Sequence, residues 1–223
     1  MIISLFTFIL AFRLKETTYT PKSLHLNQNT LFIPDNKPNI RPVFVLLILI
    51  ALINISSSIY VNFFSIYVQD ELNQSISFLA LANSIATLLG VFATYFIGRS
   101  ANMFKRKSFV LLASFLYTLF PLTLFLINNP VIVFILYCVP FYAILFVLAP
   151  VIISENSLES RRGQIMGFYI GSQYFGLLIG TVLGGILAAI NNVISPNFLV
   201  GTVIGFLSIT ICLFFFEETS NEI

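Results

Sequence analysis

Six stretches of this sequence are long, apolar and free of ionisable side chains. They contain no Lys, Arg, Asp, Glu or His, and each has about 20 residues or more, enough to cross the roughly 30 Å hydrocarbon core of a bilayer as an α-helix. The stretches are residues 43–68, 76–97, 108–127, 131–153, 164–190 and 197–216. Because membrane β-strands are shorter and alternate apolar with polar residues, the stretches predict helices. The expected fold class is an all-α integral membrane protein, a six-transmembrane-helix bundle.

The composition excludes the main soluble alternatives. Only 9% of the 223 residues are charged, whereas a typical soluble domain carries about 25% charged residues. Such a chain cannot cover a soluble surface, and it lacks the basic face of a nucleic-acid-binding protein. Two cysteines and one histidine provide no disulfide framework or His-based metal site. We therefore expect a membrane protein that is not an enzyme and uses no cofactor, metal or nucleic acid.

The basic residues alternate between loops. All 11 Lys and Arg lie before the first span, after the second span or after the fourth span, and the other three loops hold none. Since Lys and Arg remain on the cytoplasmic side, this alternation places the segment before the first span and the carboxyl terminus in the cytoplasm. It also supports the count of six spans. We expect a multi-pass protein of the cell (plasma) membrane.

The amino-terminal segment has a different character. Residues 1–12 are apolar, but a helix of that length is about 18 Å long, too short to cross the bilayer. No basic residue precedes the segment and no small-residue cleavage site follows it, which argues against a secretory signal. We interpret residues 1–12 as a partial membrane helix (stub), 13–41 as a cytoplasmic linker and 42–223 as the six-helix transmembrane domain. The stub favours truncation or a split gene.

Two cytoplasmic stretches resemble signatures of the major facilitator superfamily. In that family, a Gly is followed four residues later by Asp and then by Gly-Arg-Arg or Gly-Arg-Lys. Residues 98–107 match this signature at Gly98, Arg106 and Lys107, whereas Asn102 replaces the Asp and Lys105 replaces the second Gly. A second stretch resembles the family's loop and helix between spans 10 and 11; its matching residues are Ser154, Glu155, Arg162, Gly163, Met166 and Gly167.

The resemblance implies the carboxyl-terminal half of such a transporter, with the end of helix 6, the central loop and helices 7 to 12. The chain is then half of a major facilitator fold. Its implied function is movement of a small solute by alternating access, and it is incomplete alone. The implied partners are the lipid bilayer, a small-molecule substrate, and an N-terminal transporter half or a second copy. The alternative is a non-transporting membrane protein, either an inactive remnant or a helix-binding assembly partner.

Several polar and aromatic residues inside the spans are candidates for the substrate pathway. In the first span they are spaced three or four residues apart and share one helical face, which must turn toward protein or a water-filled cavity. The resemblance places this helix on the central pathway; the alternative is polar contact between packed helices. In the fourth span, Pro140 predicts a kink between two tyrosines. The candidates are Asn54, Ser58, Asn62, Ser65, Tyr137, Tyr142 and Gln173.

Two further sets have predicted roles in packing and gating. Glycines at four-residue spacing allow close helix approach; these are Gly176, Gly180, Gly184, Gly201 and Gly205. The cytoplasmic signature residues Gly98, Asn102, Arg106, Lys107, Glu155 and Arg162 form a candidate gate. Arg106 and Lys107 can pair with Glu155 or Glu159, or they serve only to set the topology. Because no span carries an ionisable group, a neutral or amphipathic solute is favoured.

Overall fold

A computed structural model describes residues 40–100, 106–157, 161–191 and 193–216. Six helical segments within these ranges are long and apolar enough to cross a membrane. They confirm the predicted all-α, six-span fold. The segments are Arg41–Glu71, Ile76–Ser100, Arg106–Leu126, Pro130–Asn156, Arg162–Asn191 and Ser195–Phe215. The predicted stub, Asn102 and the linker up to residue 39 lie outside the described residues.

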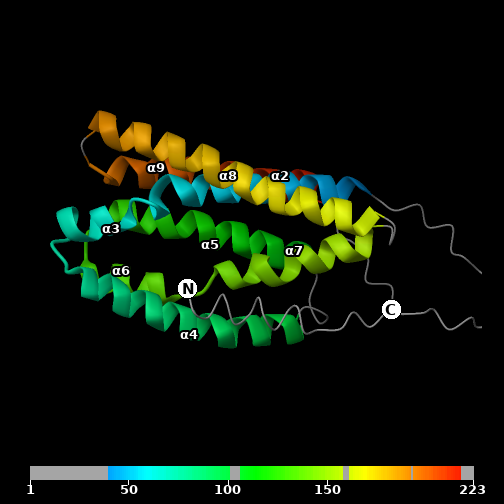
Figure 1. The fold of residues 1–223 in the computed structure, drawn as a ribbon, viewed down its shortest axis with the longest axis horizontal. Coiled ribbons are helices and arrows are strands. Elements are labelled where there is room, and N and C mark those ends of the chain that lie inside the picture. Colours follow the sequence, from blue (N-terminus) through cyan, green and yellow to red (C-terminus); the bar gives the residue numbers. More distant parts are fainter. Residues whose placement is uncertain (1–39, 101–105, 158–160, 192, 217–223) are drawn as a thin grey trace, which may run out of the picture. The chain divides into compact units, whose positions relative to one another are not determined.

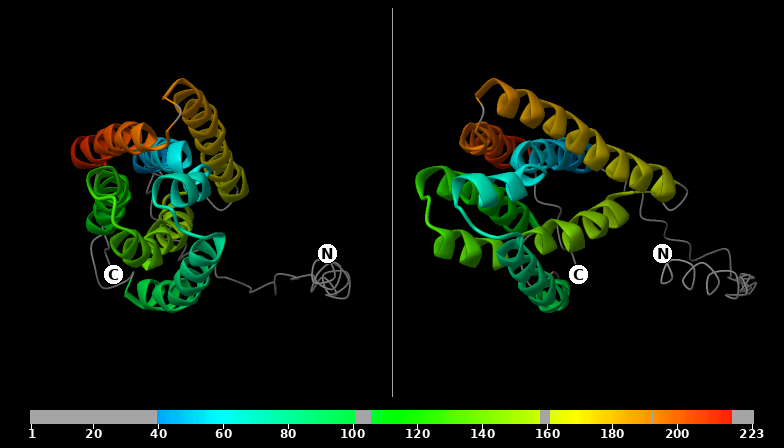
Figure 2. Two further views of the ribbon diagram at one scale, coloured as in Figure 1. Left: turned by 90° about the vertical axis from the view of Figure 1, so that its left-hand side faces the viewer. Right: turned by 60° about the vertical axis from the view of Figure 1, so that its left-hand side comes forward.

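The helices pack in two connected groups (Figures 1 and 2). In the first group, α2 (Ile40–Val61) lies against α8 (Arg162–Asn191) and α9 (Ser195–Phe215), and α9 also packs on α5 (Arg106–Leu126). In the second group, α4 (Ile76–Ser100) lies against α6 (Pro130–Cys138) and α7 (Tyr142–Asn156). Because α5 and α2 both contact α7, the two groups share one apolar core.

The first span is interrupted in its last third. After α2 ends at Val61, the chain continues through α3 (Phe64–Ile66) and a π-helical turn, η1 (Tyr67–Glu71). The Phe63 N–H donates to the Tyr60 carbonyl at 3.0 Å, so it does not reach the Ile59 carbonyl as it would in a regular helix. The Asn197 Nδ2 of α9 donates to that Ile59 carbonyl at 2.9 Å. A distant amide therefore satisfies a buried acceptor that the interruption leaves open.

The fourth span, expected over 131–153, consists of two helices, α6 and α7, with a break between them. Helix α6 ends at Cys138, and α7 begins at Tyr142. Pro140 supplies no backbone N–H and disfavours helical geometry in the residue before it. Val139 is accordingly extended, with φ −74° and ψ 116°. The proline that predicts a kink thus produces a break, whereas Pro121 and Pro150 lie inside continuous helices.

Glycines bring α8 and α9 close to their neighbours. A Cβ atom placed on Gly176 would lie 2.5 Å from the Ala51 carbonyl oxygen of α2. Gly180 and Gly184 face the next turns of α2 in the same way, Gly201 lies against Ser56, and Gly205 lies against Thr118 of α5. Each of the five glycines with a predicted packing role therefore lies at a contact between helices.

At the end of the bundle opposite Arg106, Glu71 links the first span to the sixth. Its carboxylate accepts from the backbone N–H groups of Ile194, at 2.6 Å, and Ser195, at 3.2 Å, and from the Ser195 hydroxyl. These contacts occupy donors at the start of α9, which has no side-chain cap of its own. The link holds the end of the first span beside the beginning of the sixth.

Candidate functional site

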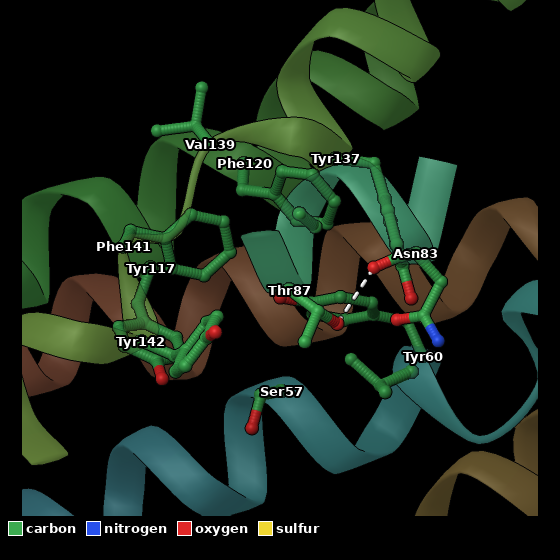
Figure 3. Close-up of a pocket in the computed structure, with 12 residues that line it drawn as sticks. Ser57, Tyr60, Asn83, Thr87, Tyr117, Phe120, Tyr137, Val139, Phe141 and Tyr142 are labelled. Carbon is green, nitrogen blue, oxygen red and sulfur yellow. Dashed lines mark hydrogen bonds between the residues drawn. The ribbon is translucent and has the colours of Figure 1, made fainter. Parts of the chain in front are cut away.

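A cavity of about 350 Å³ opens beside the break between α6 and α7 (Figure 3). The last turns of α2, the first half of α4, the middle of α5 and the break itself form its walls. The break at the extended Val139 separates the two helices, so side chains from both line the same space. The lining residues are Ser57, Tyr60, Val61, Asn83, Ala86, Thr87, Tyr117, Phe120, Tyr137, Val139, Phe141 and Tyr142.

The cavity wall is mainly apolar, and its polar groups are uncharged. It carries two hydroxyls and one amide from Ser57, Thr87 and Asn83, together with four tyrosines. Thr87 Oγ1 donates to the Asn83 carbonyl at 2.8 Å, as Figure 3 shows. Within the described part of the chain, no hydrogen bond engages the Asn83 side-chain amide or the tyrosine hydroxyls of the wall. These donors and acceptors are therefore available to a bound molecule.

Aromatic contacts hold the wall in place around the break. Tyr117 meets Phe141 edge to face, with ring centroids 4.9 Å apart, and Phe141 also contacts Phe120 at 5.2 Å. On the other side of the break, Tyr137 stacks on Phe64 at 5.0 Å with an interplanar angle of 10°. Since Phe64 begins the short helix α3, this stack joins the interruptions of the first and fourth spans.

Two of the predicted pathway residues, Tyr137 and Tyr142, line the cavity. The polar face of the first span points elsewhere, toward α8. Cβ atoms placed on Gly176 and Gly180 would lie 2.8 Å from the Cβ atoms of Asn54 and Ser58, respectively. This placement agrees with polar contact between packed helices, the alternative raised for that face.

The other pathway candidates also lie outside the cavity lining. Asn62 Nδ2 donates to Thr181 Oγ1 of α8 at 2.6 Å. Ser65 is exposed in α3, and its carbonyl accepts from Gln69 at 3.1 Å. Gln173 donates to the Tyr169 hydroxyl within α8 at 2.8 Å.

Sequence reasoning missed the polar wall residues Ser57, Asn83 and Thr87 and the two tyrosines Tyr60 and Tyr117. Ser57 directly precedes Ser58 of the polar face. Because successive residues of a helix are rotated by about 100° around its axis, the Ser57 side chain points toward a different neighbour. Asn83 and Thr87 are four residues apart on α4 and share a face. That pair of polar residues in an otherwise apolar span is the signal that identifies this wall.

Two of the described signature residues, Arg106 and Glu155, form an ion pair. Arg106, at the start of α5, contacts Glu155 of α7 with an N–O distance of 2.5 Å. The Arg106 side chain is only 4% exposed, whereas that of Glu155 is 44% exposed. Lys107 Nζ donates to the Leu213 carbonyl of α9 at 3.2 Å. Gly98 lies within α4 and Arg162 is exposed at the start of α8.

A comparison with protein-family models decides the family. Residues 46–222 match the model described as Major Facilitator Superfamily. The chain belongs to the major facilitator superfamily. Membership implies a membrane transporter rather than an enzyme, with a solute as its substrate and a lipid bilayer as its surroundings. A comparison with the curated proteins found no match.

Proposed function

We propose that this major facilitator chain moves a small solute by alternating access and supplies the carboxyl-terminal half of the transporter. It corresponds to the end of helix 6, the central loop and helices 7 to 12. The observation that carries this proposal is the uncharged cavity at the break in the fourth span. Interrupted helices beside a site near the bilayer centre are typical of secondary transporters.

The depth of the cavity supports a role in transport. Thr87 lies about 16 Å along α4 from Ile76, at 1.5 Å per residue, which is close to the middle of a hydrocarbon core of about 30 Å. The alternating basic residues support a plasma-membrane orientation with the linker and carboxyl terminus in the cytoplasm.

The wall chemistry favours an uncharged or amphipathic solute. Hydroxyl and amide groups can bond polar substituents, and the rings of Tyr117 and Phe120 can cover an apolar or ring-shaped face. A volume of about 350 Å³ falls in the range of small-molecule sites. A charged solute is disfavoured because no carboxylate, Lys or Arg lines the cavity to pair with it.

Two exposed helices support the need for a partner half. In the most apolar part of α4 and of α8, only 17% is buried, compared with 56% in the most apolar part of the first span. Apolar side chains such as Leu88, Phe92, Phe175 and Leu178 lie exposed along these two helices. We propose that an N-terminal transporter half, or a second copy of this chain, covers these faces and completes the pathway.

Transport by reconstituted protein tests the proposal. The full chain is placed in liposomes, alone and with a separately encoded amino-terminal half where an upstream reading frame provides one. Uptake of radiolabelled neutral sugars, nucleosides and amides is then measured by counterflow. Asn83→Leu removes the unpartnered amide from the wall, and we expect uptake of the transported solute to fall about tenfold, the value of one lost hydrogen bond.

Ser84→Ala is the matched control, because this neighbour on α4 bonds to the Ala80 carbonyl of its own helix and lies outside the cavity lining. Uptake equal to wild type in the Asn83→Leu variant would contradict the assignment of the cavity. If no labelled solute entered with either arrangement, the alternative of a non-transporting membrane protein would stand instead.

A further inference from the structure

One tyrosine at the edge of the cavity lies against a glycine. Gly90 is buried on α4, and a Cβ atom placed on it would overlap the hydroxyl oxygen of Tyr142 and lie 3.0 Å from its Cζ atom. The phenol of Tyr142 therefore extends from α7 to the backbone of α4. Only glycine leaves room for it there.

The positions of both residues in the fold make this contact part of the cavity wall. Gly90 follows Ala86 and Thr87 by one helical turn, so it continues the face of α4 that lines the cavity. Tyr142 is the first residue of α7 after the break, and Ala143 and Ile144, which follow it, are buried and anchor its backbone. Tyr142 is 43% exposed, so its side chain has room to move while its backbone is held.

We propose that the pair of Gly90 and Tyr142 sets the largest solute that the cavity admits, an inference that rests on the proposed transport function. Because Gly90 has no side chain, the hydroxyl end of the Tyr142 ring lies directly against α4, and the ring stays at the edge of the cavity. A side chain at position 90 pushes the ring away from α4, toward Ser57 of α2 on the facing wall, and narrows the space. Tyr142 thus contacts the solute, and Gly90 is a positioning residue that acts through it.

Thiol chemistry tests this geometry without any transport. The two native cysteines, Cys138 and Cys212, are buried and are replaced by alanine. Ser57→Cys then places a single reporter thiol on the α2 wall of the cavity. Its rates of reaction with methyl methanethiosulfonate and with the larger benzyl methanethiosulfonate are measured on the purified full chain in detergent.

Gly90→Ala is expected to slow the benzyl reagent about tenfold and the methyl reagent about twofold or less, because pocket size discriminates most strongly against the larger group. Gly171→Ala on α8 is the matched control, since nothing lies within 4 Å of its added Cβ. Both changes raise helix propensity equally. Only the change at position 90 should alter the two rates.

The variant Gly90→Ala/Tyr142→Ala separates this contact from a general disturbance. Removing the ring should restore the benzyl rate to the wild-type value or above, and Tyr142→Ala alone should raise it. A benzyl rate unaffected by Gly90→Ala, or one that stays slow in the double variant, would overturn the proposal. If Gly90→Ala fails to give a monodisperse protein, an unchanged benzyl rate in Tyr142→Ala overturns it equally. Absence of these effects would contradict the role of the residue pair, whereas absence of solute uptake by the wild type would contradict the proposed transport function.

Discussion

Replacing Gly180 by alanine should weaken the packing of α8 against α2. The added Cβ would lie 2.5 Å from the Ile55 carbonyl oxygen, 3.1 Å from the Ile55 Cα atom and 2.8 Å from the Ser58 Cβ atom. Two of these three atoms belong to the backbone of α2, so no change of rotamer relieves the overlap. The two helices must move apart along a contact that continues at Gly176 and Gly184.

The expected cost follows from two opposing effects. Inserting a methyl group into a well-packed contact costs about 1–3 kcal/mol, whereas Gly→Ala inside a helix gains up to about 1 kcal/mol in propensity. We therefore expect a net destabilisation of about 1–2 kcal/mol. Gly171→Ala on the same helix is the control, because nothing lies within 4 Å of its added Cβ, and it should stabilise the helix by up to about 1 kcal/mol.

Reversible unfolding of the purified full chain measures this difference. The protein is titrated with sodium dodecyl sulfate in mixed micelles, and loss of native structure is followed by circular dichroism. The free energies of unfolding of the two variants should differ by about 1–3 kcal/mol, with Gly180→Ala the less stable, because the gain in helix propensity is common to both. Equal stability of Gly180→Ala and Gly171→Ala would refute the close-packing argument.

Two other predictions concern the charges. Glu155→Gln removes the carboxylate charge that contacts the nearly buried Arg106, so the free energy of unfolding in the same titration should fall by about 2 kcal/mol, reduced from the value for a fully buried pair because Glu155 is half-exposed. The exposed Arg162→Gln should change it by no more than about 0.5 kcal/mol, and the reasoning fails if the two variants behave alike. For the orientation, Ser75→Cys in a background without native cysteines should react with an impermeant maleimide on intact cells, and Arg161→Cys only after permeabilisation. The opposite labelling pattern would reverse the proposed topology.

The break in the fourth span shows how far local sequence information reaches. Pro140 identified the place where the helix is disturbed, because its missing N–H and fixed φ are properties of the residue itself. The extent of the disturbance depended on the surroundings: Pro121 and Pro150 remain inside helices, whereas at Pro140 the chain is extended. The interruption of the first span at Val61 has no proline, and Asn197 from the last span satisfies a carbonyl there.

The sequence by itself determined the all-α fold and its six membrane spans, because the length of an apolar run and the absence of charges within it are local properties of the chain. It also predicted glycines that allow close helix approach, and it indicated Arg106 and Glu155 as one of several possible pairs. Only the tertiary structure decided which polar side chains reach a cavity. Asn54 and Ser58 face α8, whereas Ser57 lines the cavity, although the three residues lie close together on one helix. The function of a helix face depends on which helix packs against it, and those neighbours come from distant parts of the chain.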